Sequence, residues 1–134
     1  MTQPFLRKAE TSVKSARMLL DAGDTDSACS RAYYAMYDAA RACLSWADFA
    51  PVRGEFKTHQ GLMTAFSMHL VKPGLFPAEI GKAFQNVQTL RQIADYEASP
   101  VPREKAEQAL AAAEGFVATA AALISGPYRR PAGE

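Results

Sequence analysis

The sequence has few of the residues that mark a metal site or a disulfide framework. It contains two cysteines and two histidines among 134 residues. Cys29 and Cys43 fall in one expected helix, where a rise of about 1.5 Å per residue separates them by roughly 21 Å, too far for a disulfide. His59 and His69 are scattered in sequence from the cysteines, so we expect no structural metal. The motifs of phosphate-binding loops, dinucleotide sites, nucleophile elbows and metalloproteases are also missing, and we expect no cofactor.

An excess of charge of one sign and long apolar runs are lacking as well. The chain has 15 basic and 14 acidic residues, a formal net charge of +1. No global basic field therefore indicates nucleic-acid binding, and any such contact needs a local cluster. The first residues do not form a basic segment followed by an apolar run, and no stretch approaches the roughly 18 apolar residues of a membrane span. We expect a cytoplasmic protein without membrane contact, a compartment that suits two unpaired thiols.

Helical periodicity dominates what is present. Prolines, glycines and N-cap residues divide the chain into five helical segments, expected at about residues 4–22, 25–46, 58–71, 77–98 and 102–124. The apolar stripe of the second segment is rich in alanine, which lets a neighbouring helix approach closely. No segment alternates polar and apolar residues as a half-buried strand does. We expect an all-α, up-and-down bundle of five helices, one domain of residues 1–125, and a disordered tail of residues 126–134.

Polar residues interrupt the apolar patterns of the second and fourth segments. Arg31, Tyr34 and Asp38 fall on one face of the second helix, and Arg91 and Asp95 are four residues apart on the fourth. A buried arginine needs a carboxylate partner. We therefore expect Arg31 to pair with Asp95 and to join the two helices. Such pairing and a catalytic role both remain open for these residues.

A third polar feature opens the segment at residues 58–71. Thr58 is the expected N-cap, with Lys57 before it and His59 after it. A basic residue and a histidine beside free backbone N–H groups can bind phosphate. Histidine is also suited to general acid–base chemistry, because its ordinary pKa is near neutrality. An ordinary capped helix start with exposed polar residues explains the same pattern.

Aromatic residues gather on the second segment, at Tyr33, Tyr34 and Tyr37. Their spacing does not form one continuous stripe, so some must face a neighbouring helix and others a partner chain or solvent. Packing in the core or at a dimer interface explains them, and stacking on nucleic-acid bases is the alternative.

Three segments carry a family resemblance: SRAYYA at residues 30–35, KTHQGL at 57–62 and LRQIADY at 90–96. In this order and spacing they resemble small prokaryotic HEPN-domain proteins, where the name means higher eukaryotes and prokaryotes nucleotide-binding. The resemblance extends over about residues 5–124. It implies a helical bundle that dimerises through its helices. It also implies a partner from the small nucleotidyltransferases, often in a toxin–antitoxin or defence pair.

Many HEPN proteins are metal-independent ribonucleases, whose motif is an arginine followed four to six residues later by a histidine. Arg91 matches that arginine, but the positions expected for histidine hold Tyr96, Glu97 and Ala98. Tyrosine, with an ordinary pKa of about 10, is a poor substitute for histidine in acid–base catalysis. The hypothesis is that another helix brings His59 to Arg91.

The resemblance leaves three functions open. The first is a non-catalytic, homodimeric partner of a nucleotidyltransferase that binds a nucleotide or RNA near the second and fourth helices, through Arg31, Tyr34, Lys57 and Arg91. The second is a ribonuclease toxin with a displaced catalytic set: Arg91, His59, Asp95 and Tyr96. The third is a helical-repeat scaffold, for which a second repeat about 34 residues away should exist and is not found.

Overall fold

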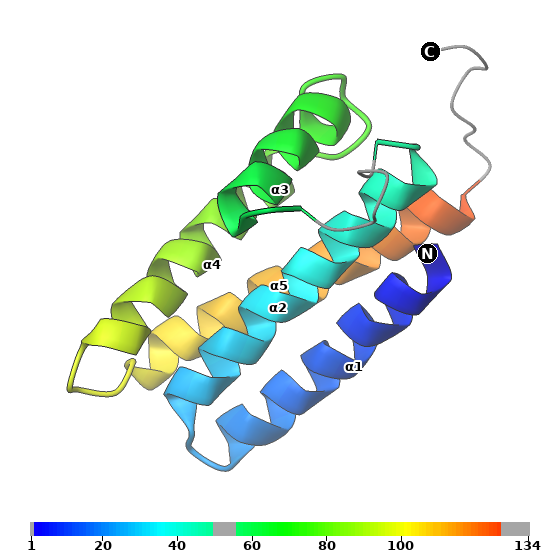
Figure 1. Cartoon of the computed structure of the whole chain (residues 1–134). Helices are drawn as coiled ribbons and strands as arrows, with labels where there is room; N and C mark the ends of the chain where they lie inside the picture. The colour runs from blue at the N-terminus through cyan, green and yellow to red at the C-terminus, as the bar shows by residue number, and fades with distance from the viewer. Residues whose placement is uncertain (1, 50–55, 127–134) are drawn as a thin grey trace.

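The computed structural model describes residues 2–49 and 56–126, and within them it confirms an all-α bundle (Figure 1). The elements in chain order are α1 (Thr2–Asp21), α2 (Thr25–Trp46), α3 (His59–Phe66), the π-helical turn η1 (Ser67–Val71), α4 (Ala78–Tyr96) and α5 (Arg103–Ser125). These described residues contain no strand. The expected disordered tail lies outside them, apart from Gly126.

Side-chain caps fix where α2 and α3 begin. The Asp24 carboxylate accepts a hydrogen bond from the backbone N–H of Ser27 at 3.1 Å, and the Thr58 hydroxyl accepts one from Gly61 at 2.9 Å. Each bond satisfies an N–H group that has no partner within the first turn of its helix. Gly23, at φ +85°, makes the left-handed turn that reverses the chain between α1 and α2.

Helix α2 is the centre of the bundle. It packs against α1, α3, α4 and α5, and α1 lies alongside it in the opposite direction (Figure 1). The expected stripe of α2 is fully or almost fully buried, and it comprises Ala28, Ala32, Ala35, Met36, Ala39, Ala40 and Cys43. Its many small side chains bring neighbouring backbones close and leave the larger volumes to Phe66, Phe76, Phe84 and Phe116.

The third segment differs from the single helix expected at residues 58–71. Its last turn is η1, where the N–H of Lys72 donates to the carbonyl of Ser67 over a wider turn, at 2.8 Å. This turn brings Val71 against α4 at Gly81, where a β-carbon would lie 2.8 Å from Val71 Cγ2. The chain can therefore fold back closely from η1 to α4, which sets the position of α3 over α2.

Helix α5 is long and apolar, although we expected no stretch that approaches a membrane span. By length and composition alone it is the one described helix that could cross a membrane. One such helix is also what the core of a water-soluble bundle contains. Seven of its residues are buried, and it packs against α1, α2 and α4. The backbone N–H of Val101, just before α5, donates to Asp26 at 2.8 Å and ties its start to α2.

Candidate functional site

Three tyrosines of α2 surround the histidine that opens α3. The ring centre of His59 lies 4.8 Å from that of Tyr37, 5.6 Å from Tyr33 and 5.8 Å from Tyr34. Tyr33 is fully buried, whereas Tyr34, Tyr37 and His59 are half-buried. The Thr58 cap fixes the first turn of α3 and hence the placement of His59. Aromatic packing therefore holds an ionisable ring at the boundary between core and solvent.

Arg91 of α4 contacts two of the same tyrosines. Its guanidinium carbon lies 4.9 Å from the ring centre of Tyr33 and 5.9 Å from that of Tyr34. Two hydrogen bonds of 2.9 Å orient it, from Nε to Gln88 Oε1 and from Nη1 to Asp95 Oδ2. These contacts fix the group, while its other N–H donors make no hydrogen bond to the described residues. A positioned cation with free donors is what binding of a phosphate oxygen requires.

His59 is biased toward its neutral form. Burial lowers its pKa below the ordinary 6.5, and the positive charge of Arg91 lowers it further. Neither ring nitrogen hydrogen-bonds to another described residue. A neutral imidazole with a free nitrogen can accept a proton near neutral pH. We call this arrangement of Tyr33, Tyr34, Tyr37, His59 and Arg91 the His–Arg site.

The expected pair between Arg31 and Asp95 is wrong. Asp95 pairs instead with Arg91 on its own helix, at 2.9 Å, and its side chain is 51 % exposed. Arg31 is exposed and lies against the ring of Tyr34, at 5.7 Å from the ring centre. An exposed arginine keeps its hydration, so the demand for a buried carboxylate that motivated the pairing does not apply.

The remaining predicted site residues lie at the periphery. Tyr96 ends α4 with 90 % of its surface exposed, so it takes no part in the packed His–Arg site. Lys57 is exposed and precedes the α3 cap by one residue. Asp95 touches the site only through its ion pair with Arg91. The structure thus brings together two of the four residues of the displaced catalytic set, and Asp95 as the support of one.

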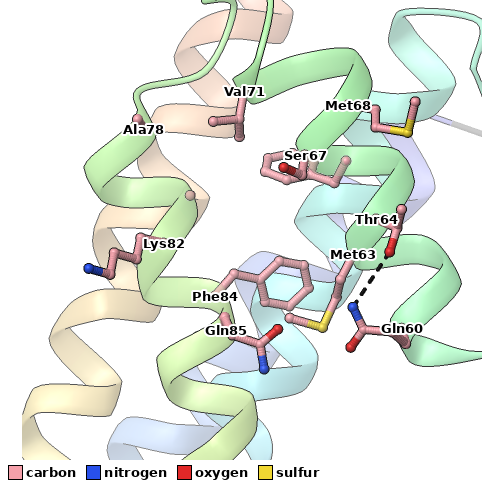
Figure 2. A pocket seen from close by; sticks show the side chains of 12 residues that line it. Gln60, Met63, Thr64, Ser67, Met68, Val71, Ala78, Lys82, Phe84 and Gln85 are labelled. Carbon is pink, nitrogen blue, oxygen red and sulfur yellow. Dashed lines mark hydrogen bonds between the residues drawn. The ribbon is translucent and has the colours of Figure 1, made fainter.

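The cavity between α3, η1 and α4 is a poorer candidate for chemistry. It has a volume of about 430 Å³, and its walls are mainly apolar or uncharged (Figure 2). Gln60 bonds to Thr64 across one edge, and Lys82 is the one charged side chain of the lining. With a single cation and no general base, this cavity offers no acid–base pair.

The cysteines are unsuited to catalysis, and the described residues gather no metal-binding group of three or more His, Cys, Asp or Glu side chains. Cys29 and Cys43 are buried, unbonded thiols. Burial raises the pKa of Cys29 to about 11, with a contribution from Asp26, and that of Cys43 to about 12. Both stay protonated near neutrality and lack the reactive thiolate.

Sequence reasoning missed Gln88, which is buried and orients Arg91. Its signal was its spacing, since residues 84, 88, 91 and 95 share one face of α4. For Tyr33 and Tyr37 the sequence allowed either packing in the core or at a dimer interface, or stacking on nucleic-acid bases. Tyr33 is a core residue whose buried hydroxyl has no hydrogen-bond partner among the described residues, and Tyr37 forms a wall for His59.

Comparison with known proteins gives one family. The pattern of the HEPN domain matches residues 2–123. A UPF0332 protein of Gloeobacter violaceus is 35 % identical over 94 residues, which cover 70 % of this chain and 71 % of that protein. A Methanocaldococcus jannaschii protein named "Putative toxin" is 30 % identical over 115 residues, 86 % of this chain and 82 % of its own. A UPF0332 protein of Thermotoga maritima is 29 % identical over 119 residues, covering 88 % and 86 % of the two chains.

Proposed function

Because this chain belongs to the HEPN-domain family, we propose that it is a toxin-like ribonuclease of the cytoplasm that cleaves RNA without a metal at the His–Arg site. The observation that carries the proposal is the convergence of His59 and Arg91 on the rings of Tyr33 and Tyr34. The two residues come from α3 and α4, so the missing histidine after Arg91 is replaced by one from another helix. The name of the M. jannaschii relative supports a toxin-like role.

The proposed reaction is the internal transfer of a phosphodiester. Neutral His59 takes the proton of a ribose 2′-hydroxyl, whose oxygen then attacks the adjacent phosphorus. Arg91 donates hydrogen bonds to the oxygens on which negative charge develops. The bond from phosphorus to the 5′-oxygen breaks, and that oxygen takes a proton from water. The hydroxide left behind takes up the proton that His59 releases, so the histidine returns to its neutral form. The products are a 2′,3′-cyclic phosphate and a 5′-hydroxyl, and the step needs no oxidant or metal.

The test is RNA cleavage in the presence of EDTA by wild type, His59→Ala and Arg91→Ala. Each substitution should lower the rate by about 10²-fold or more, the usual contribution of a general base or an oxyanion donor. Expression of the wild type, but not of either variant, should arrest growth. A matched control is His69→Ala, which removes the other histidine. His69 stacks on Phe49 with ring centres 4.1 Å apart and does not belong to the His–Arg site. Equal cleavage by wild type and Arg91→Ala would contradict the assignment.

A second function is favoured because the acid–base groups recorded against His59 are tyrosines, whose ordinary pKa of about 10 makes them poor proton donors or acceptors near neutral pH. In it the chain is a non-catalytic, homodimeric partner of a nucleotidyltransferase and binds a nucleotide or RNA through Arg31, Tyr34, Lys57 and Arg91. Co-purification with a nucleotidyltransferase encoded by a neighbouring gene tests this partnership. RNA binding without cleavage, weakened by Arg91→Ala, would favour this function over the ribonuclease.

A further inference from the structure

A second hollow lies between α1 and α2, and Tyr34 forms part of its lining. It has a volume of about 660 Å³. Its charged lining is Arg7, Lys8, Arg31, Arg41 and Asp38. We call it the α1–α2 groove, and it runs where the first half of α1 lies alongside α2 (Figure 1).

The charge of this groove differs from that of the whole chain. Four basic side chains and one carboxylate leave an excess of three positive charges, whereas the entire sequence has a net charge of +1. The one acid, Asp38, is largely buried and already faces Arg41 at 3.6 Å. Burial raises the pKa of Asp38, while Lys8, Arg41 and Arg31 each act to lower it, so three cations surround one point. This is the local basic cluster that the overall composition conceals.

The cations that reach into solvent are those least engaged in packing. Arg7, Lys8 and Arg31 are exposed, whereas Arg41 lies over the ring of Phe5 at 3.9 Å and beside Asp38. A paired, mostly buried arginine thus forms the base of the groove, and three exposed cations form its rim. Exposed cations around an open groove can bind an anion without first breaking a buried ion pair.

Tyrosines connect the groove to the His–Arg site. Tyr34 and Tyr37 line the groove, and both contact His59. Two arginines also lie near the ring of Tyr34, with Arg31 at 5.7 Å and Arg91 at 5.9 Å from its centre. The positive charge therefore continues from α1, past two aromatic faces, to the proposed reaction centre.

We propose that the α1–α2 groove binds the phosphates of single-stranded RNA beside the phosphodiester held at His59 and Arg91. The inference rests on the proposed function and adds where the strand lies. A basic groove lined with aromatic rings is how proteins hold single strands, since cations follow the backbone and rings stack on bases. A cluster of four cations and a separate arginine, joined by tyrosines, suit a chain of several phosphates better than one nucleotide. Ring faces suit bases better than an acidic peptide.

The experiment measures fluorescence anisotropy of labelled oligouridine, about 4 and about 12 nucleotides long, over a series of salt concentrations. The 2′-hydroxyls of the probe are methylated, so that the wild type cannot cleave it. The Arg7→Ala/Lys8→Ala variant changes two exposed residues of the groove rim. We expect it to weaken binding of the longer strand by about tenfold. The slope of log affinity against log salt should fall by about 1.4, since each lost contact to a single strand contributes about 0.7.

The matched control is Lys14→Ala/Lys105→Ala, which removes the same charge from exposed positions outside the groove. It should bind the longer strand with nearly the affinity of wild type. Circular dichroism checks that both double variants keep the helical fold. The shorter strand should discriminate less between the two variants, because it has fewer phosphates to contact the groove.

The outcomes separate the groove from the proposed function. If wild type binds RNA and the groove variant behaves as the control, the groove assignment is wrong and the His–Arg site stands. If wild type binds no RNA at low salt, both are wrong. Competition by uridine triphosphate as strong as that of the longer strand would assign the groove to a single nucleotide. Equal competition by polyglutamate would assign it to an acidic protein segment, and either result would overturn the proposal.

Discussion

The two sides of α2 near Tyr34 differ in packing and in charge. On the side of α3 and α4, one arginine and one histidine are packed among tyrosine rings, and burial favours the neutral form of His59. On the side of α1, four cations and one largely buried carboxylate line an open groove. The first environment suits proton transfer, and the second suits binding of a charged chain. One helix can serve both because its successive polar residues point to different neighbours.

The largest effect in this comparison is expected for Arg91→Lys. Lysine keeps the charge but cannot reproduce the guanidinium's bonds to Gln88 and Asp95 or its contact with Tyr33. We expect RNA cleavage to fall by about 10²-fold, the effect of losing one well-placed oxyanion donor. Single-turnover cleavage assays measure it. The matched change Arg31→Lys, in the groove, should alter cleavage by less than about threefold, and a larger loss there would erase the distinction between the two sides.

The next effect is the pH dependence of cleavage. The pKa of His59 lies below 6.5 because of burial and Arg91, so the base is already neutral at pH 7. Cleavage should rise about tenfold per pH unit at acidic pH and level off with a midpoint below 6.5. The free energy of unfolding should fall as the pH drops from 6.5 through this lower pKa, since protonation then favours the unfolded chain. A midpoint clearly above 6.5 would show that another group is the base.

The bundle could be predicted from the sequence to within a few residues, because each helix has its own punctuation. The Thr58 cap, the alanine stripe of α2 and the stops at Gly23 and Pro73 are local signals. The π turn η1 was missed because its cause is not local. It accompanies the close approach of Val71 to Gly81 on a helix that comes later in the chain.

The site was only half predictable for a similar reason. The motifs marked His59 and Arg91 as polar residues in apolar surroundings, but their meeting depends on how α3 lies over α2. The pairing of Asp95 was mistaken because sequence spacing allowed two partners and burial decided between them. Arg31 proved exposed, while the side chain of Arg91 is 15 % exposed and uses Asp95 itself. Arg7 and Lys8 gave no motif, and three dimensions were needed to place them beside Tyr34.

A smaller effect is expected for Tyr33→Phe. The hydroxyl of Tyr33 is buried without a hydrogen-bond partner among the described residues, and burial raises its pKa strongly, so it is neutral. An unsatisfied buried hydroxyl costs about 1–3 kcal/mol. Its removal should therefore raise the free energy of unfolding by about 1 kcal/mol, measured by urea denaturation, while the ring still supports Arg91. A loss of stability would show that the hydroxyl has a hydrogen-bond partner, such as a bound water, in the folded protein.

The smallest effect on stability is expected for Arg31→Ala. Arg31 is exposed and lies against the ring of Tyr34, so the free energy of unfolding should change by less than about 0.5 kcal/mol. RNA binding should weaken, because a cation is lost where the groove meets the His–Arg site. The same urea denaturation and anisotropy measurements serve both readouts. A loss of about 3 kcal/mol is typical of a broken buried ion pair. It would support the predicted pair between Arg31 and Asp95 and give Arg31 a structural role.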